Sequence, residues 1–217
     1  MSLSMRVVVP PHPLIAHWLC VARDAETPTP LFRTAITELG RWLTYELLRD
    51  WLPHRPVSVH TPLGDSDGHV IDASVELAVV PILRAGLGLW EGGQAVLPTA
   101  RVWHVGLRRD EQTSQPHWYL DGLPDVIGER TGVLVYDPMI ATGGSLLAVL
   151  ERLKQKGVAG PRLRVISVLA AAPGLRRLGE AMPDLHLHTA CIDEQLNARN
   201  FIVPGLGDAG DRFFGTG

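Results

Sequence analysis

One stretch of the chain, VLVYDPMIATGGSLLAVL, combines an acidic residue with a glycine-rich turn in the pattern of a phosphate site. An apolar run that predicts a buried strand ends at Tyr136, Asp137 follows, and Thr142-Gly143-Gly144-Ser145 opens a helical pattern. Adjacent glycines let backbone N–H groups approach an anion, the helix N-terminus adds its positive dipole end, and the hydroxyls add donors. The lysine of a P-loop is missing after the second glycine. The alternative is an ordinary helix start that Thr142 or Ser145 caps.

A second candidate anion site lies upstream, in the segment PILRAGLGLWEGG. Arg84 directly follows an apolar run, and Gly86 and Gly88 come next. An arginine at the carboxyl end of a strand, beside glycine backbone, can engage a phosphate group bidentately. We therefore predict a site for a second, more highly charged phosphate group. The competing interpretation is a surface arginine paired with Glu91.

The chain then enters a polar stretch, LRRDEQTSQPHWYLDGLP, without helical or strand periodicity. A loop of this length in a compact domain is typically a lid or a disordered segment, so we expect residues 109–124 to form a flexible lid. Arg108 and Arg109 at its base could reach an anion, or they could be solvated surface charges.

The tail PGLGDAGDRFFGTG is a third glycine-rich segment. Gly205, Gly207 and Gly210 have the G-x-G-x-x-G spacing of a dinucleotide-binding turn, but that turn needs a helix after it. Because only seven residues follow Gly210, we expect no helix there and reject the dinucleotide interpretation. The tail is then either an ordered site of another kind or a frayed chain end.

Strands and helices alternate along most of the chain and must position these loops. Apolar or β-branched runs of strand length occupy residues 75–83, 100–107, 132–136, 162–171 and 185–192. Helical segments separate most of them, notably residues 145–157 and 173–182. This alternation predicts a Rossmann-like, doubly wound α/β fold with a mainly parallel sheet, in which ligands bind beyond the carboxyl ends of the strands.

The first 50 residues have a helical character and predict a helical layer on the sheet. The stripe that should face the sheet consists of Leu31, Ala35, Leu39, Leu43 and Leu47. Residues 53–73 give only short strand-like pieces. No linker, repeat or low-complexity segment interrupts residues 1–217, so we expect a single domain, with residues 1–4 as an additional leader or an alternative start before Met5.

Composition narrows the class of protein. Twenty Lys and Arg against 23 Asp and Glu give a formal charge of −3, which disfavours a general nucleic-acid binder. No apolar run reaches the ~20 residues of a membrane span and no signal sequence is visible, so we expect no membrane partner and a cytoplasmic location. Cys20 and Cys191 are expected to be unpaired in that compartment. His186 and His188 alternate on one strand face, but no partner at ligand spacing supports a metal site.

Taken together, several motifs resemble the uracil phosphoribosyltransferase family, in the same order and at matching separations from about Arg6 to the end. They are LTYE (43–46), VPILRAGLG, DPMIATGGS, IDEQLN (192–197) and IVPGLGDAGDRFFGT. The resemblance implies a type I phosphoribosyltransferase fold, with residues 193–217 forming a base-binding hood. It also implies an enzyme that makes UMP and diphosphate from uracil and 5-phosphoribosyl 1-diphosphate (PRPP), in pyrimidine salvage.

The resemblance assigns roles to individual residues. Asp137 would bind the ribose hydroxyls, Arg84 and Arg109 the diphosphate, and the backbone around Leu83–Arg84–Ala85 would have an unusual, sometimes cis, peptide. Asp208 would meet PRPP and its magnesium through water, and whether it is also the general base stays open. The 5-phosphate loop would comprise Asp137, Pro138, Met139, Ile140, Ala141, Thr142, Gly143, Gly144 and Ser145. Uracil would be read by Ile202, Gly207, Asp208 and Ala209.

The resemblance also implies cofactors and an oligomeric state, and two alternative functions remain open. The resemblance implies Mg²⁺ bound mainly through PRPP and diphosphate, and a homodimer or larger homo-oligomer. It leaves open whether GTP is an allosteric activator. Asp211 and Arg212 are expected to organise the tail, and Phe213 and Phe214 to anchor it by burial. The rivals are a pyrimidine-responsive RNA-binding regulator on the same fold, which the formal charge of −3 disfavours, and a purine-specific enzyme.

Overall fold

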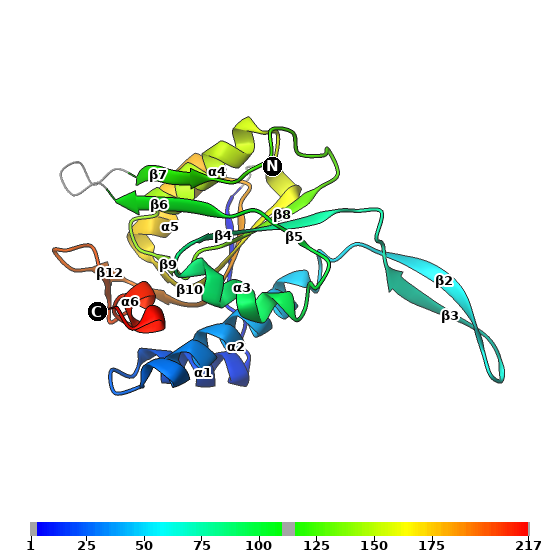
Figure 1. The fold of residues 1–217 in the computed structure, drawn as a ribbon, viewed down its shortest axis with the longest axis horizontal. Coiled ribbons are helices and arrows are strands. Elements are labelled where there is room, and N and C mark those ends of the chain that lie inside the picture. Colours follow the sequence, from blue (N-terminus) through cyan, green and yellow to red (C-terminus); the bar gives the residue numbers. More distant parts are fainter. Residues whose placement is uncertain (1–3, 110–115, 217) are drawn as a thin grey trace.

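A nine-stranded, mainly parallel sheet forms the centre of the molecule (Figure 1). The computed structural model describes residues 4–109 and 116–216, with the side chain of Arg109 excepted. The path of the sheet runs β1 (Arg6–Val8), β11 (His186–Asp193), β10 (Leu163–Ala171), β8 (Gly132–Tyr136), β4 (Leu77–Leu83), β6 (Val105–Arg109) and β7 (Pro116–Asp121). Two short strands extend it: β5 (Arg101–Val102) beside β4, and β9 (Met139–Ile140) beside β10.

Helices cover both faces of this sheet, as predicted for a doubly wound fold. α1 (Pro13–Arg23), α2 (Thr29–Leu48) and α3 (Gly86–Gln94) pack on one face, and α4 (Gly144–Gln155) and α5 (Ala172–Ala181) on the other. Alternating strand residues separate the two cores: Val79 faces the first and Val80 the second. Both faces are therefore buried, which explains the continuous apolar runs of β4, β8 and β10.

The strand and helix predictions are confirmed with shifts of a few residues at their ends, except that residues 100–107 form parts of two strands, β5 and β6, instead of one. The prediction for the N-terminus is corrected. Residues 6–8 form the edge strand β1, parallel to β11, instead of beginning a helix. On α2 the stripe is buried except at its first position, because Leu31 is 42% exposed and Phe32 takes its place in the core. The helix begins at Thr29, and this phase turns Phe32 inward.

Residues 53–73 form more structure than their composition predicted. β2 (His54–Thr61) and β3 (Gly64–Ile71) pair over their whole length as an antiparallel hairpin that projects from the body (Figure 1). Most of its side chains are exposed, so only the short pieces VSVH and HVID marked it in the sequence.

The C-terminal segment closes over one end of the sheet. It contains the short ladder of β12 (Gln195–Leu196) with β13 (Ile202–Val203) and the helix α6 (Ala209–Phe214). Elsewhere in the chain, a 3₁₀ turn, η1 (Gly160–Arg162), directly precedes β10. The chain end is thus ordered up to residue 216, and the frayed-end alternative is wrong.

Candidate active site

A pocket of about 770 Å³ lies beyond the carboxyl ends of β4 and β8. These strands are neighbours in the sheet, and Arg84 and Asp137 directly follow their last residues. The expected site residues that line the pocket are Arg84, Asp137, Pro138, Met139, Ala141, Ser145, Ile202, Gly207, Asp208 and Ala209. An adjoining hollow of about 40 Å³ is lined by Asp137, Met139, Ile140, Ala141, Thr142, Gly143, Gly144, Ser145 and Leu146.

The loop before α4 has the geometry of an anion cradle. Gly143 is the N-cap residue with φ of 74°, a left-handed conformation that favours glycine. The N-cap position therefore belongs to Gly143 and not to Thr142 or Ser145, the two residues of the alternative interpretation. The first N–H groups of a helix lack intrahelical partners, and here they border the small hollow. Backbone N–H groups and the helix dipole can thus bind a phosphate at this point.

Asp137 sits at the start of this loop with its carboxyl half-buried in the pocket floor. Its backbone N–H donates to the Ile166 carbonyl of the neighbouring strand at 3.1 Å, which fixes its position at the sheet edge. Burial raises the pKa of the carboxyl to about 7, although a hydrogen bond from the Met139 backbone N–H partly opposes this change. The carboxyl is therefore poised between its neutral and charged forms near neutral pH.

Arg84 lies at the pocket mouth with 57% of its side chain exposed. Its guanidinium is 3.6 Å from Asp211 Oδ1 and stacks over the Phe214 ring, so its ionic partner belongs to the tail and not to the helix with Glu91. The peptide bond between Leu83 and Arg84 is cis, which confirms the unusual backbone expected there. Arg84 is accessible to an anion that enters the pocket.

The tail supplies the opposite wall. Asp208 is exposed in the pocket, and its Oδ1 accepts the Asp211 backbone N–H at 3.0 Å as the N-cap of α6. The expectation that no helix follows the tail glycines is thus wrong, because this cap stabilises six helical residues. Phe213 is 8% exposed and packs against Gly88, while Phe214 is only partly buried.

Arg212 and Asp211 organise the tail, as expected. Arg212 donates to the carbonyls of Ala22, Asp24 and Leu206 and stacks on the Phe32 ring. Asp211 accepts a hydrogen bond from the Thr216 hydroxyl at 2.9 Å.

The segment expected to be a lid is partly a strand. Residues 116–121 form β7, which pairs antiparallel with β6, because cross-strand hydrogen bonds order a sequence that lacks apolar alternation. Arg108 and Tyr119 of this hairpin line the pocket. The Arg109 side chain and residues 110–115 lie outside the described part of the chain, so the contact of Arg109 with diphosphate and the lid movement stay predictions.

Sequence reasoning missed several residues beside the pocket. Arg199, Asn200 and Phe201 line it between the two tail strands, with the Arg199 guanidinium 5.9 Å from the centre of the Phe201 ring. A Cβ added at Gly144 would lie 3.4 Å from Nη1 of Arg177, so this guanidinium borders the phosphate loop. The one signal in the sequence was the aromatic residue Phe201 directly before the tail motif, which the structure leaves 40% exposed.

The doubly wound sheet, the phosphate loop before α4 and the hood over the strand ends define a type I phosphoribosyltransferase. Comparisons with known proteins narrow this class. The uracil phosphoribosyltransferase family profile matches residues 9–216, and the chain belongs to the uracil phosphoribosyltransferase family.

Individual relatives agree with this assignment. The chain is 58% identical over 216 residues to the uracil phosphoribosyltransferase of Synechococcus elongatus, covering 100% of both chains. It is 47% identical to the chloroplastic uracil phosphoribosyltransferase of Arabidopsis thaliana, covering 99% of this chain and 73% of the relative. The solved structure of the AQ2163 protein from Aquifex aeolicus superposes with a TM-score of 0.87 at 36% identity, over 97% and 98% of the two chains.

Within residues 4–109 and 116–216, no helix is long and apolar enough to cross a membrane. In the same ranges, no group of three or more His, Cys, Asp and Glu side chains could hold a metal ion, and Cys20 and Cys191 are both free thiols.

Proposed function

We propose that the protein transfers the 5-phosphoribosyl group of PRPP to N1 of uracil, giving UMP and diphosphate. The observation that carries this proposal is the single pocket that joins a phosphate loop, an exposed arginine and a glycine-rich backbone wall. Those three parts match the phosphate, diphosphate and base ends of the two substrates. The comparisons give no support to the alternative of an RNA-binding regulator.

The 5-phosphate end of PRPP would bind at the N-terminus of α4. The N–H groups around Gly143 and Gly144, with the hydroxyls of Thr142 and Ser145, would donate to the phosphate oxygens, and residues 137–141 would form the floor beside the ribose. Asp137 would accept hydrogen bonds from the ribose hydroxyls. Such donors favour the charged carboxylate, so binding should lower its pKa below the value of about 7 that burial gives it in the free protein.

The reaction breaks the bond between C1 of ribose and diphosphate and forms the bond from C1 to N1 of uracil. Diphosphate leaves with the electron pair, so negative charge grows on it while positive charge grows on the sugar. We assign Arg84 and Arg109 to the leaving group, because fixed guanidinium groups stabilise developing negative charge without reorganisation. Closure of residues 109–124 would keep water from C1.

Uracil would lie against the tail. Its flat ring has two carbonyl acceptors and an N3–H donor, which backbone groups of Ile202, Gly207 and Ala209 can read at close range. Ile202 and Ala209 are buried and hold the backbone in place, while Gly207 is exposed to the pocket. Asp208 lies between Gly207 and Ala209 in the chain. A pH profile of kcat would test whether its carboxylate takes the N1 proton of uracil.

Magnesium is the proposed cofactor. The donor set fits a cation held mainly by substrate, since the pocket offers carboxylates at Asp137 and Asp208 and no protein cage is needed for Mg²⁺. When bound to the diphosphate oxygens, Mg²⁺ would neutralise charge on the leaving group. Asp208 would hold it through water.

The direct test is to incubate the protein with PRPP, Mg²⁺ and one base at a time, and to measure nucleotide and diphosphate. Uracil should give UMP, whereas cytosine, hypoxanthine and guanine should not react. Turnover of hypoxanthine without turnover of uracil would refute the assignment. Deleting residues 204–217 should abolish uracil binding while the phosphate loop still binds ribose 5-phosphate.

We further propose GTP activation, a homodimeric or larger assembly, and a cytoplasmic location. The projecting hairpin of β2 and β3 supports self-association, because it exposes Val59, Val70 and Ile71 outside the body of the protein. Rate measurements with and without GTP, and sedimentation of the wild-type chain, test the first two proposals.

A further inference from the structure

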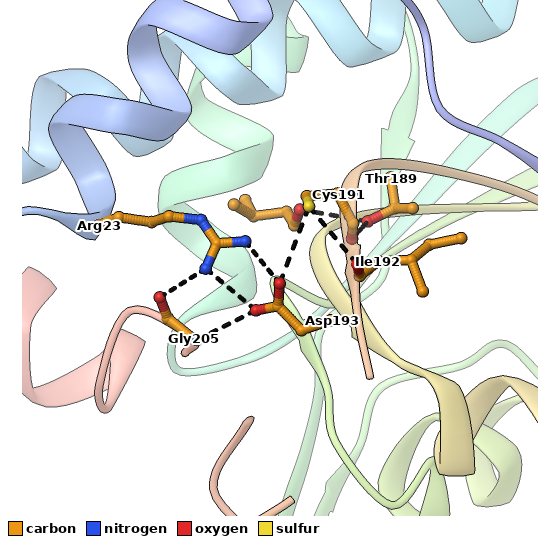
Figure 2. A network of polar contacts seen from close by, with 7 residues as sticks. Arg23, Thr189, Cys191, Ile192, Asp193 and Gly205 are labelled. Carbon is orange, nitrogen blue, oxygen red and sulfur yellow. Dashed lines mark hydrogen bonds and ion pairs between the residues drawn. The ribbon is translucent and has the colours of Figure 1, made fainter. Parts of the chain in front are cut away.

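An ion pair outside the pocket connects α1 to the turn that precedes the uracil-reading residues. Arg23, the last residue of α1, donates from Nη2 to Asp193 Oδ1 at 2.7 Å and from Nη1 to Asp193 Oδ2 at 3.0 Å (Figure 2). Asp193 ends β11, and its side chain is 5% exposed against 22% for Arg23. Bidentate, charge-assisted geometry of this kind restricts both side chains to one arrangement.

Both polar backbone groups of Gly205 are bound to this pair. Its N–H donates to Asp193 Oδ2 at 3.0 Å, and its carbonyl accepts from Arg23 Nη1 at 2.9 Å (Figure 2). Gly205 has φ of 60°, and a Cβ there would lie 2.2 Å from the Ile202 carbonyl oxygen, so another residue type could not make the same turn. The Cys191 thiol adds a weak contact to Asp193 Oδ1 at 3.8 Å.

The next carbonyl in the chain is fixed to the same end of α1. Arg212 donates to the Leu206 carbonyl at 2.7 Å and to the carbonyls of Ala22 and Asp24. Two guanidinium groups therefore hold the successive carbonyls of Gly205 and Leu206, and Gly207 and Asp208 follow at once. Short loops without regular structure keep a defined backbone only where such contacts determine it.

We propose that Arg23 and Asp193 are positioning residues for the uracil subsite. Neither is among the residues described as lining the pocket, so they act through Gly205 on the backbone at residues 207–209. The phosphate loop is carried by β8 and α4, so binding of the ribose phosphate end does not depend on the pair. This inference rests on the proposed function, because it concerns which substrate the tail reads.

The test compares Arg23→Met with the control Arg49→Met. The control removes another arginine–carboxylate ion pair away from the pocket, in which Nη2 of Arg49 donates to both carboxylate oxygens of Glu46. Arg23→Met should raise KM for uracil at least about tenfold, since misplacing a binding group by ~1 Å can cost up to ~100-fold. KM for PRPP should stay within about twofold, and the control should change neither constant.

Equilibrium binding separates positioning from general damage to the fold. The affinity for UMP should fall with the Arg23 variant, while that for ribose 5-phosphate should not, because only UMP carries the base. Arg23→Lys keeps the charge but offers one ammonium in place of a fork, and it should give an intermediate KM for uracil. If Arg23→Met does not fold, Arg23→Lys and Asp193→Asn are judged by the same comparison.

The outcomes distinguish a failure of the proposed function from a failure of the positioning role. Wild-type protein that does not use uracil would refute the proposed function itself. Wild-type turnover of uracil together with unchanged KM values in the Arg23 variants would refute the positioning role. Equal losses of affinity for UMP and ribose 5-phosphate would also refute it, because they would show only a structural role.

Discussion

Replacing Asp137 by asparagine should stabilise the ligand-free protein at alkaline pH and leave its stability unchanged at acid pH. Burial raises the pKa of this carboxyl from 3.8 to about 7. Between these values the folded protein keeps a proton that the unfolded chain has released, so the free energy of unfolding falls as pH rises and levels off above 7. At ~1.4 kcal/mol per pH unit, the interval between the two pKa values corresponds to a decrease of about 4 kcal/mol in the free energy of unfolding.

The assay is urea-induced unfolding of both proteins at intervals between about pH 4 and 9, without substrates. The two curves should coincide near pH 4, and the asparagine variant should gain up to about 4 kcal/mol relative to wild type by pH 8. Every other titrating group is present in both chains, so the pH-dependent part of the difference belongs to Asp137. A difference that does not vary with pH would refute the reasoning.

The same variant should be less active while it is more stable. Asparagine keeps an acceptor for the Met139 N–H but cannot offer a carboxylate to the ribose hydroxyls. We expect kcat/KM for PRPP to fall about 100-fold or more, the size of loss typical for a positioned charged group. Higher stability with lower activity is expected where a buried charge is needed for function but destabilises the fold.

Three further changes probe the tail and the strand β11. Asp208→Asn keeps the N-cap acceptor of α6 but removes the charge, so kcat should fall about 100-fold with an unchanged Tm, and normal kinetics would remove Asp208 from the site. Gly88→Ala places a Cβ 2.2 Å from the Phe213 ring. Overpacking should cost ~1–3 kcal/mol and raise KM for uracil, and a wild-type Tm would contradict this contact. Burial, then Arg6 and Arg164, lower the pKa of His188 to about 4. Wild-type stability should therefore fall as pH drops from 6.5 toward 4, whereas His188→Gln should lose less in urea unfolding over that range.

Segments with both faces buried were the most predictable parts of the fold. β4, β8 and β10 read as continuous apolar runs, since helices cover the sheet on both sides. β7 and the hairpin of β2 and β3 depend on cross-strand hydrogen bonds between polar or exposed residues, so their sequences show alternation only over short pieces or not at all. β1 is too short to have a pattern of its own and forms because β11 offers it a parallel edge.

The residues of the site differ in the same way in how well the sequence predicts them: those in contiguous motifs could be predicted, and those brought in by tertiary contacts could not. The phosphate loop and the tail are contiguous segments, and their glycines and hydroxyls could be read directly as an anion cradle and a close-approach wall. Arg23 and Asp193 are 170 residues apart, and Arg177 reaches the loop from α5. No local pattern distinguishes such side chains from surface arginines and a strand-end acid, because their roles arise from tertiary contacts.

These observations explain how a chain end with little regular structure can provide a selective wall. Strand ends fix Arg84 and Asp137, because hydrogen bonds to neighbouring strands leave the backbone little freedom there. The tail has only a two-residue ladder and a six-residue helix, so it needs side chains to fix its carbonyls. The guanidinium groups of Arg23, the last residue of α1, and Arg212 of α6 supply that restraint. Selectivity for the base should therefore be lost more readily by mutation than affinity for the ribose phosphate.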